Sequence, residues 1–226
     1  MDVVFNKKKI VSTLVFFALG LIVIHVILLG LYYYIDDPKK FAFVKVFNLG
    51  MEKNIPTIFS SLILAISALC FYVLSKVPEE IKDKKNKYWL GLSFVFLFLS
   101  FDETAKLHER LGDLIAKFID NDGYIYYPWV IGYGIFVLIL GFFYMKFFWN
   151  MEKKIFRSFM LSAFIYLSGA VVLEMIGSNE ASQHGSKSGL YRILYTFEES
   201  LEMFGVIYLI WILLTLLENR RVVIKA

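Results

Sequence analysis

Long apolar blocks separated by short polar stretches set the pattern of this 226-residue chain. A helix needs roughly 20 residues to cross a hydrocarbon core of about 30 Å, and six blocks reach that length. The four prolines lie at block boundaries, where a missing backbone N–H is tolerated. The pattern therefore predicts an all-α, polytopic transmembrane bundle that forms a single domain over residues 1–226. The six predicted spans are residues 10–35, 56–75, 88–108, 128–149, 156–177 and 190–217.

The segments between these spans predict an orientation and two interfacial helices. Lysines and arginines precede the first span, join the second to the third and the fourth to the fifth, and end the chain. The positive-inside rule therefore predicts that both the N-terminus and the C-terminus are cytoplasmic. Residues 38–50 and 109–119, on the outer side, carry apolar side chains at helical spacing among charged ones, which is typical of helices in the headgroup plane. The outer segment 178–188 is polar and rich in small residues, and we expect a flexible loop that covers what lies beneath it.

Composition agrees with this pattern and excludes several classes of protein. Hydrophobic residues make up 58% and charged residues 19% of the chain, against roughly 45–50% and 25% in soluble globular domains. These values, with 18% aromatic residues, exclude a typical soluble enzyme, a nucleic-acid-binding module and a disordered chain. The single cysteine, Cys70, excludes an intrachain disulfide and a cysteine-based metal site. We expect a multi-pass protein of a bacterial inner membrane that has the lipid bilayer as its partner, no nucleic acid, and a homo-oligomer as an open alternative.

Acidic side chains and imidazoles occur inside the apolar blocks, where an ionised group costs about 2.5–3.5 kcal/mol even on insertion scales. Counting along each span at about 1.5 Å per residue places these groups at one depth, in the outer leaflet. Every predicted span delivers at least one polar side chain to this layer. The predicted layer consists of His25, Ser60, Asp102, Glu103, His108, Glu109, Tyr133, Glu174, Glu198, Glu199 and Glu202, with His184 in the loop above it. Because Asp102 and Glu109 are seven residues apart, we expect them on one face of one helix.

Such a group of carboxylates cannot remain ionised and unpaired at low dielectric. The first candidate is a divalent metal held by Asp102, Glu103, Glu174, Glu198, Glu199 and Glu202, with His108 or Glu109 as a ligand or catalytic general base. Helical bundles hold iron or manganese pairs in this way. Zinc would require His25, His108 and His184 to converge, whereas magnesium or calcium accept an oxygen-only shell, so all five metals stay open. An enzyme of this kind would act on a lipid or lipid-linked substrate that enters from the outer leaflet.

Two other classes of function use the same acids. A transporter or channel subunit would couple them to protons or a small cation, although the sequence shows no inverted repeat. A structural or sensory subunit would neutralise them in salt bridges with Lys106, Arg110 and Arg192 at helix ends that project from the bilayer. In that case a lone buried histidine such as His25 is a satisfied core residue.

The segment Ser-Phe-Asp-Glu-Thr-Ala-Lys-Leu-His-Glu at residues 100–109 resembles a stretch of uncharacterised bacterial multi-pass membrane proteins with a DExxxxHE pattern. The resemblance covers about ten residues and implies a multi-pass membrane protein without assigning an activity. The motifs of characterised intramembrane enzymes do not match. The Glu-Glu-x-x-x-Arg motif of CAAX-type proteases, for example, would need arginine at the position of Met203.

Overall fold

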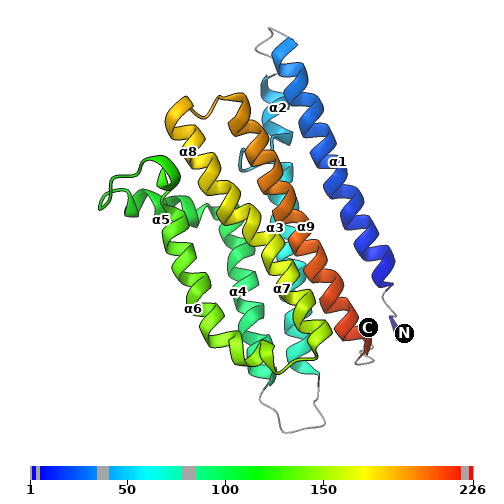
Figure 1. Ribbon diagram of the computed structural model, residues 1–226. Helices are drawn as coiled ribbons and strands as arrows, with labels where there is room; N and C mark the ends of the chain where they lie inside the picture. The colour runs from blue at the N-terminus through cyan, green and yellow to red at the C-terminus, as the bar shows by residue number, and fades with distance from the viewer. Residues whose placement is uncertain (1, 4–5, 35–40, 78–84, 220–223, 226) are drawn as a thin grey trace.

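The computed structural model describes residues 2–3, 6–34, 41–77, 85–219 and 224–225, and over these residues long helices run side by side in a bundle (Figure 1). The helical elements are α1 (Lys7–Tyr34), α2 (Phe41–Phe47), α3 (Ile55–Lys76), α4 (Lys85–Ala105), α5 (Leu107–Ile115), the 3-10 turn η2 (Gly123–Ile125), α6 (Trp129–Trp149), α7 (Lys153–Leu167), the π-helical segment η3 (Ser168–Leu173), α8 (Glu174–His184) and α9 (Gly189–Asn219). Two-residue strands β1 (Asp2–Val3) and β2 (Ile224–Lys225) pair antiparallel. The beginning and end of the described chain therefore lie together, at one end of the bundle. We call the other end, which carries α2, α5 and the α8–α9 connection, the site end.

Five helical stretches of the described residues are long and apolar enough to cross a membrane, which supports a multi-pass membrane protein. They are Lys7–Tyr32, Ile55–Lys76, Trp129–Trp149, Lys153–His184 and Gly189–Asn219. These stretches overlap five of the six predicted spans. The remaining predicted span corresponds to α4, whose last turn holds Asp102 and Glu103 and so shortens its apolar run. That sixth span and the cytoplasmic placement of both termini stay predictions.

The third predicted span, residues 88–108, ends earlier than expected. Helix α4 stops at Ala105, Lys106 adopts a left-handed backbone with φ 57° and ψ 44°, and α5 begins at Leu107. Left-handed backbone is unfavourable for a non-glycine residue and cannot continue a right-handed helix. The chain therefore turns at Lys106, and α5 points away from the axis of α4 (Figure 1). The expectation that Asp102 and Glu109 share a face of one continuous helix is wrong.

The helices predicted to be interfacial are shorter than expected. Helix α5 begins two residues before the predicted segment 109–119 and ends at Ile115. Within the predicted segment 38–50 the structure has α2, Phe41–Phe47, while residues 38–40 lie outside the described residues. Their location in the headgroup plane stays a prediction.

The segment 178–188 is mostly helical rather than a flexible loop. Helix α7 continues through η3 and α8 as far as His184. Ser178 accepts a hydrogen bond from the backbone N–H of Tyr127 at 3.4 Å, and Ser182 accepts one from Gly123 at 3.2 Å. The small polar residues that indicated a loop instead let η2 and the start of α6 approach α8 closely.

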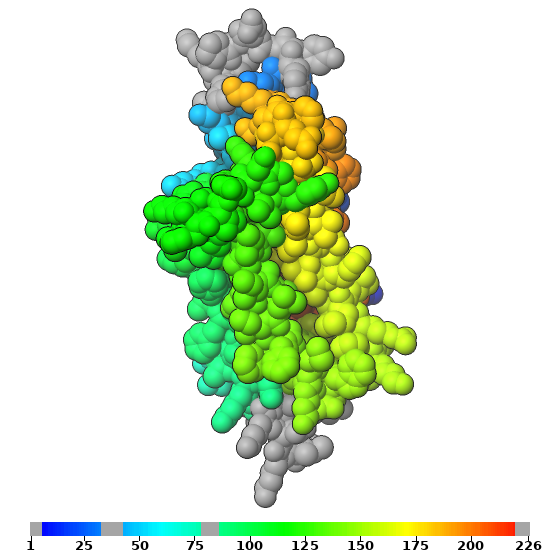
Figure 2. All heavy atoms as spheres, turned by 60° about the vertical axis from the view of Figure 1, so that its left-hand side comes forward, coloured from blue at the N-terminus to red at the C-terminus, as the bar shows by residue number. Residues whose placement is uncertain are grey.

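The apolar core lies around α9 and α3, where Ile210, Leu213 and Phe71 are completely or almost completely buried. Helix α6 is different, because large apolar side chains such as Leu138 and Phe142 are exposed along it. Figure 2 turns the side formed by α6 and α7 forward, with α5 projecting beside the site end of α6. An exposed apolar helix is the expected state of a surface that faces lipid.

Candidate functional site

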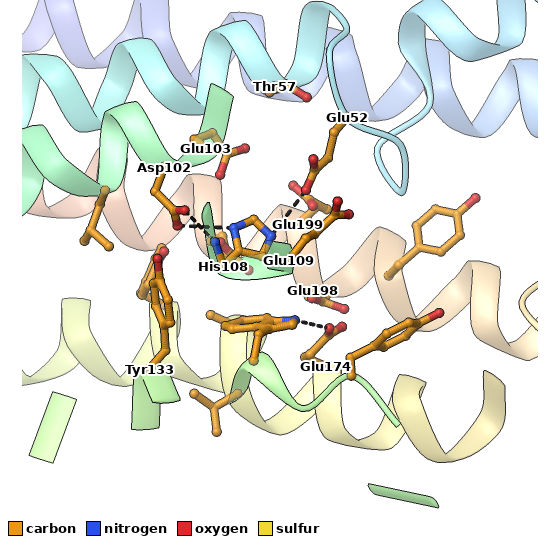
Figure 3. Close-up of a pocket in the computed structure, with 18 of the residues that line it drawn as sticks. Glu52, Thr57, Asp102, Glu103, His108, Glu109, Tyr133, Glu174, Glu198 and Glu199 are labelled. Carbon is orange, nitrogen blue, oxygen red and sulfur yellow. Dashed lines mark hydrogen bonds and ion pairs between the residues drawn. The ribbon is translucent and has the colours of Figure 1, made fainter. Parts of the chain in front are cut away.

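A cavity of about 1440 Å³ is lined by residues of α3 to α9 and extends to the site end of the bundle. Most of the predicted polar layer lies in its wall. The predicted residues that line it are Asp102, Glu103, His108, Glu109, Tyr133, Glu174, Glu198, Glu199 and Glu202. Figure 3 shows side chains from α4, α5, α8 and α9 directed toward this common space. The depth count along separate spans therefore identified residues that the fold brings together.

His108 lies at the centre of an ion-pair network. Its Nδ1 is 3.2 Å from Oδ2 of Asp102, and its Nε2 is 3.3 Å from Oε1 of Glu52 (Figure 3). The ammonium group of Lys106 pairs with Glu52 and lies 3.1 Å from Oε2 of Glu109. We call these five residues the paired cluster. Two bases thus compensate three carboxylates, as the salt-bridge interpretation of the sequence requires for this part of the site.

The two carboxylates that flank the imidazole determine its charge. Burial alone would lower the pKa of His108, but hydrogen bonds and negative charge from Asp102 and Glu52 raise it to about 10. Burial also opposes ionisation of Glu52, but its hydrogen bonds with His108 and Lys106 and their positive charge lower its pKa overall. His108 is therefore an imidazolium at neutral pH, with both ring nitrogens donating. The predicted role of His108 as a metal ligand or general base requires removal of that proton.

Asp102 also holds the break between α4 and α5 in place. Its Oδ1 accepts a hydrogen bond from the backbone N–H of His108 at 2.8 Å. This N–H belongs to the first turn of α5, where helices leave their N–H groups without an internal partner. The buried hydroxyl of Tyr133 lies near the same carboxylate without reaching good hydrogen-bond geometry. Asp102 thus has a structural role as a helix cap in addition to its place in the paired cluster.

The other carboxylates of the cavity differ in having no basic partner. They form what we call the glutamate cluster, which consists of Glu103 of α4, Glu174 of α8, and Glu198, Glu199 and Glu202 of α9. Within the described part of the chain, no lysine, arginine or histidine forms an ion pair with any of these five glutamates. Among the described residues, the ion pairs that the salt-bridge interpretation expects from Lys106, Arg110 and Arg192 are therefore not formed with these five glutamates.

Neighbouring side chains show how the glutamate cluster is arranged without bases. Glu174 accepts a hydrogen bond from Nε1 of Trp129 at 2.9 Å, and its carboxyl group lies close to that of Glu198 (Figure 3). Two carboxylates this close repel each other unless a proton or a cation lies between them. Glu202 lies on the same side of α9 as the partly buried Tyr166 of α7, and both line the cavity. Among the described residues, no three His, Cys, Asp or Glu side chains are already arranged as a metal-ligand group.

Close helix contacts position the glutamate cluster. A Cβ atom at Gly169 of η3 would lie 2.6 Å from the carbonyl oxygen of Glu198, and one at Gly205 of α9 would lie 2.8 Å from the backbone nitrogen of Tyr166. Glycine at both positions therefore permits α9 to pack directly on the backbone of α7 and η3. The π-helical segment η3 ends directly before Glu174, and such segments often occur at functional sites.

His25, although predicted at the same depth, lies outside the cavity wall. Its Nδ1 accepts a hydrogen bond from the backbone N–H of Leu49 at 3.2 Å, and its Nε2 is 3.1 Å from Oγ1 of Thr196. The imidazole is buried and joins α1, the α2–α3 connection and α9. His25 is thus a satisfied core residue, the second of the two interpretations that the sequence left open.

Ser60 and His184 also lie outside the wall of the cavity. The neighbour of Ser60, Ser61, donates a hydrogen bond to the carbonyl oxygen of Ser100 at 2.8 Å and so joins α3 to α4. His184 is exposed at the end of α8 and lies 3.1 Å from Glu180. The three histidines therefore do not converge, and the condition for a zinc site of that type is not met.

Glu52 is a member of the paired cluster that the sequence prediction missed, because the depth count considered only residues inside spans. A signal was present two residues later. Asn54 accepts a hydrogen bond from the backbone N–H of Thr57 at 3.1 Å and so caps α3, and Pro56 follows in the first turn. This combination marks a helix start. It places Glu52 at the level of the other helix ends of the site.

The chain matches the family described as Domain of unknown function (DUF8692) over residues 13–217. The matched range includes the complete paired cluster and the complete glutamate cluster. No curated protein and no solved structure matches the chain.

Proposed function

We propose that this chain, which belongs to the DUF8692 family, is an integral membrane protein that binds a divalent cation in its glutamate cluster. The contrast between the two clusters carries this proposal. The paired cluster has Lys106 and His108 as bases, whereas the glutamate cluster has no basic partner among the described residues. Carboxylates crowded together inside a helical bundle need protons or cations to offset their repulsion and desolvation.

The available donor atoms favour a hard cation. Both ring nitrogens of His108 are already directed at carboxylates, and Cys70 does not line the cavity. The glutamate cluster therefore offers oxygen atoms, which favour magnesium, calcium or manganese over zinc. Magnesium in particular keeps several waters and needs one or two carboxylates. A neighbouring pair such as Glu174 and Glu198 supplies this number without a preassembled set of three protein ligands.

A cation at this position would present positive charge to an anionic group of a substrate. In the enzymatic form of the proposal it would also polarise a substrate oxygen or activate a water molecule. The lining of the cavity then determines which molecules reach it.

Manganese binding by the purified protein tests the proposal, because the bound and free ions are distinguished by electron paramagnetic resonance. Wild type in detergent is compared with Glu198→Gln and with Glu180→Gln, a control on α8 outside the cavity wall. We expect stoichiometric binding to wild type and to the control, and a loss of at least about tenfold in affinity for Glu198→Gln. A wild-type protein that binds no manganese, or a Glu198→Gln protein that binds it equally well, would overturn the proposal.

The closeness of the Glu174 and Glu198 carboxyl groups favours a second candidate, proton exchange, because two adjacent carboxylates at low dielectric can share one proton. Metal binding to a pair that shares a proton releases that proton. A pH-sensitive dye should therefore report proton release when manganese is added to wild type. Proton flux into liposomes without any added metal would instead support a proton-coupled transporter.

A further inference from the structure

The cavity has a second part with different chemistry, which we call the apolar arm. It continues from the glutamate cluster toward the opposite end of the bundle. The apolar arm is lined by Phe71 of α3, Leu92 and Phe96 of α4, Leu140 of α6, Phe159 of α7 and Leu209 of α9. The same cavity thus joins a carboxylate-rich end to a hydrocarbon-like interior.

The length of the apolar arm matches a lipid chain. Along α4, ten residues separate Asp102 from Leu92, which corresponds to about 15 Å. From Glu174 back to Phe159 along η3 and α7, fifteen residues correspond to about 22 Å. One leaflet of a bilayer has a hydrocarbon thickness of about 15 Å, half of the full core. The arm is therefore deep enough for a chain of the length found in membrane lipids.

A buried serine beside the apolar arm is already satisfied by the protein. The hydroxyl group of Ser162 donates to the carbonyl oxygen of Gly205 at 2.8 Å. A buried water needs two to four polar partners, and an apolar cavity of this kind does not supply them. Hydrocarbon is consequently a better occupant of the arm than water.

The cavity also opens sideways, toward the region that lipid occupies. Met160 of α7 lines the cavity and yet keeps 40% of its surface exposed. Helix α6 contacts α7 through Trp149 and Phe156 near the turn that joins them, and it reaches α8 through Trp129 at the other end. Figure 2 shows α6 and α7 with a hollow between them. A chain can therefore enter laterally between these helices without passing through water.

The site end of the cavity adds basic side chains above the glutamate cluster. Lys187 and Arg192 line the cavity there. Bases near the mouth and a divalent cation below them form a suitable environment for a phosphate group, whose oxygens bind both. Without the cation, the glutamates would repel such a group.

We propose that the cavity binds a lipid phosphate, with its hydrocarbon chain in the apolar arm and its phosphate between the bound cation and the bases at the site end. This inference rests on the proposed function, because the cation reverses the charge that the phosphate meets. Free phosphate and a phospholipid headgroup present the same phosphate group to the site. The apolar arm favours the lipid, because only the lipid has a hydrocarbon chain to fill it.

Adjacent residues of α6 provide a matched test. Val137 lines the cavity, whereas its neighbour Leu138 is 74% exposed and faces away from it. Val137→Trp fills the apolar arm, and Leu138→Trp adds the same bulk outside it. Val95→Trp on α4, paired with the exposed position Phe94→Trp, repeats the comparison on a second helix. Manganese binding by each variant shows that it is folded and that the glutamate cluster is intact.

The probe is oleoyl lysophosphatidic acid, with inorganic phosphate as the headgroup control, and binding is measured by native mass spectrometry and calorimetry. We expect the dissociation constant of the lipid to rise by at least about tenfold in Val137→Trp, because the larger side chain overfills the space that the hydrocarbon chain occupies. We also expect the same loss after manganese is removed and no loss in Leu138→Trp. Equal lipid binding by wild type and both cavity variants, or binding of inorganic phosphate as tight as that of the lipid, would overturn the inference. Absence of manganese binding would instead overturn the proposed function.

Discussion

Replacement of His108 by glutamine removes the central cation of the paired cluster and gives a sharp test of its electrostatics. The imidazolium is 3.2 Å from Asp102 and 3.3 Å from Glu52, and its side chain is 17% exposed. Removing one partner of a largely buried ion pair costs about 3–5 kcal/mol. Independently, a pKa of about 10 against 6.5 corresponds to about 5 kcal/mol. Because water partly screens Glu52, we expect a loss of about 3 kcal/mol in the free energy of unfolding at neutral pH.

The contribution of His108 has a definite pH dependence. Its pKa is higher in the folded than in the unfolded protein, so its stabilisation is fully present below about pH 6.5 and is lost as the pH rises through about 10. The difference in unfolding free energy between wild type and His108→Gln should therefore shrink over this window. The titration of tyrosines and lysines affects both proteins and cancels in the difference.

Reversible unfolding in mixed micelles of dodecyl maltoside and sodium dodecyl sulfate, followed by circular dichroism, measures this difference at each pH. The reasoning fails if His108→Gln is as stable as wild type near pH 6. It also fails if the difference is the same near pH 6 and above pH 10, because a neutral histidine would then explain the contacts equally well.

Two further substitutions test the packing around the site. Gly169→Ala should lower stability by about 1–3 kcal/mol, because the new Cβ would lie 2.6 Å from the carbonyl oxygen of Glu198. Gly141→Ala, with no atom within 4 Å, should raise stability by up to about 1 kcal/mol, and thermal melting in detergent compares the two. His25→Phe should cost about 1–3 kcal/mol, because the buried N–H of Leu49 loses its acceptor. If His25→Phe had the same free energy of unfolding as wild type, another group would have to accept the hydrogen bond of the Leu49 N–H.

The sequence predicted the long helices well because apolar length is a local property. Helix α6 begins one residue from the predicted boundary and ends at it, and α9 extends the predicted span by one residue at its start and two at its end. The sequence did not predict the break at Lys106, because neither glycine nor proline marks it. The turn depends on interactions with Glu52 and Glu109, which lie outside α4 and become visible only when the loops are placed.

The same limit applies to the candidate site. Counting residues along a span gives the height of a side chain in the bundle but not its direction around the helix axis. Glu202 and Glu174 had both the right height and the right direction, whereas His25 had the right height and faces Leu49 and Thr196 instead. Direction depends on how the helices pack, and Gly169 and Gly205 contribute to that packing through contacts between segments far apart in the chain.

The break at Lys106 explains why adjacent acids serve different clusters. Neighbouring residues on a helix with about 3.6 residues per turn point about 100° apart. Asp102 consequently accepts the hydrogen bond from the backbone N–H of His108 in the first turn of α5, while Glu103 lines the cavity with the glutamates of α9. Both bases nearest to the break are engaged by the paired cluster, and none is left for Glu103. An arrangement that served stability alone would distribute these bases over both sets of acids, since uncompensated carboxylates in a membrane protein are costly. The cost of the glutamate cluster is therefore the physical reason to assign it a ligand.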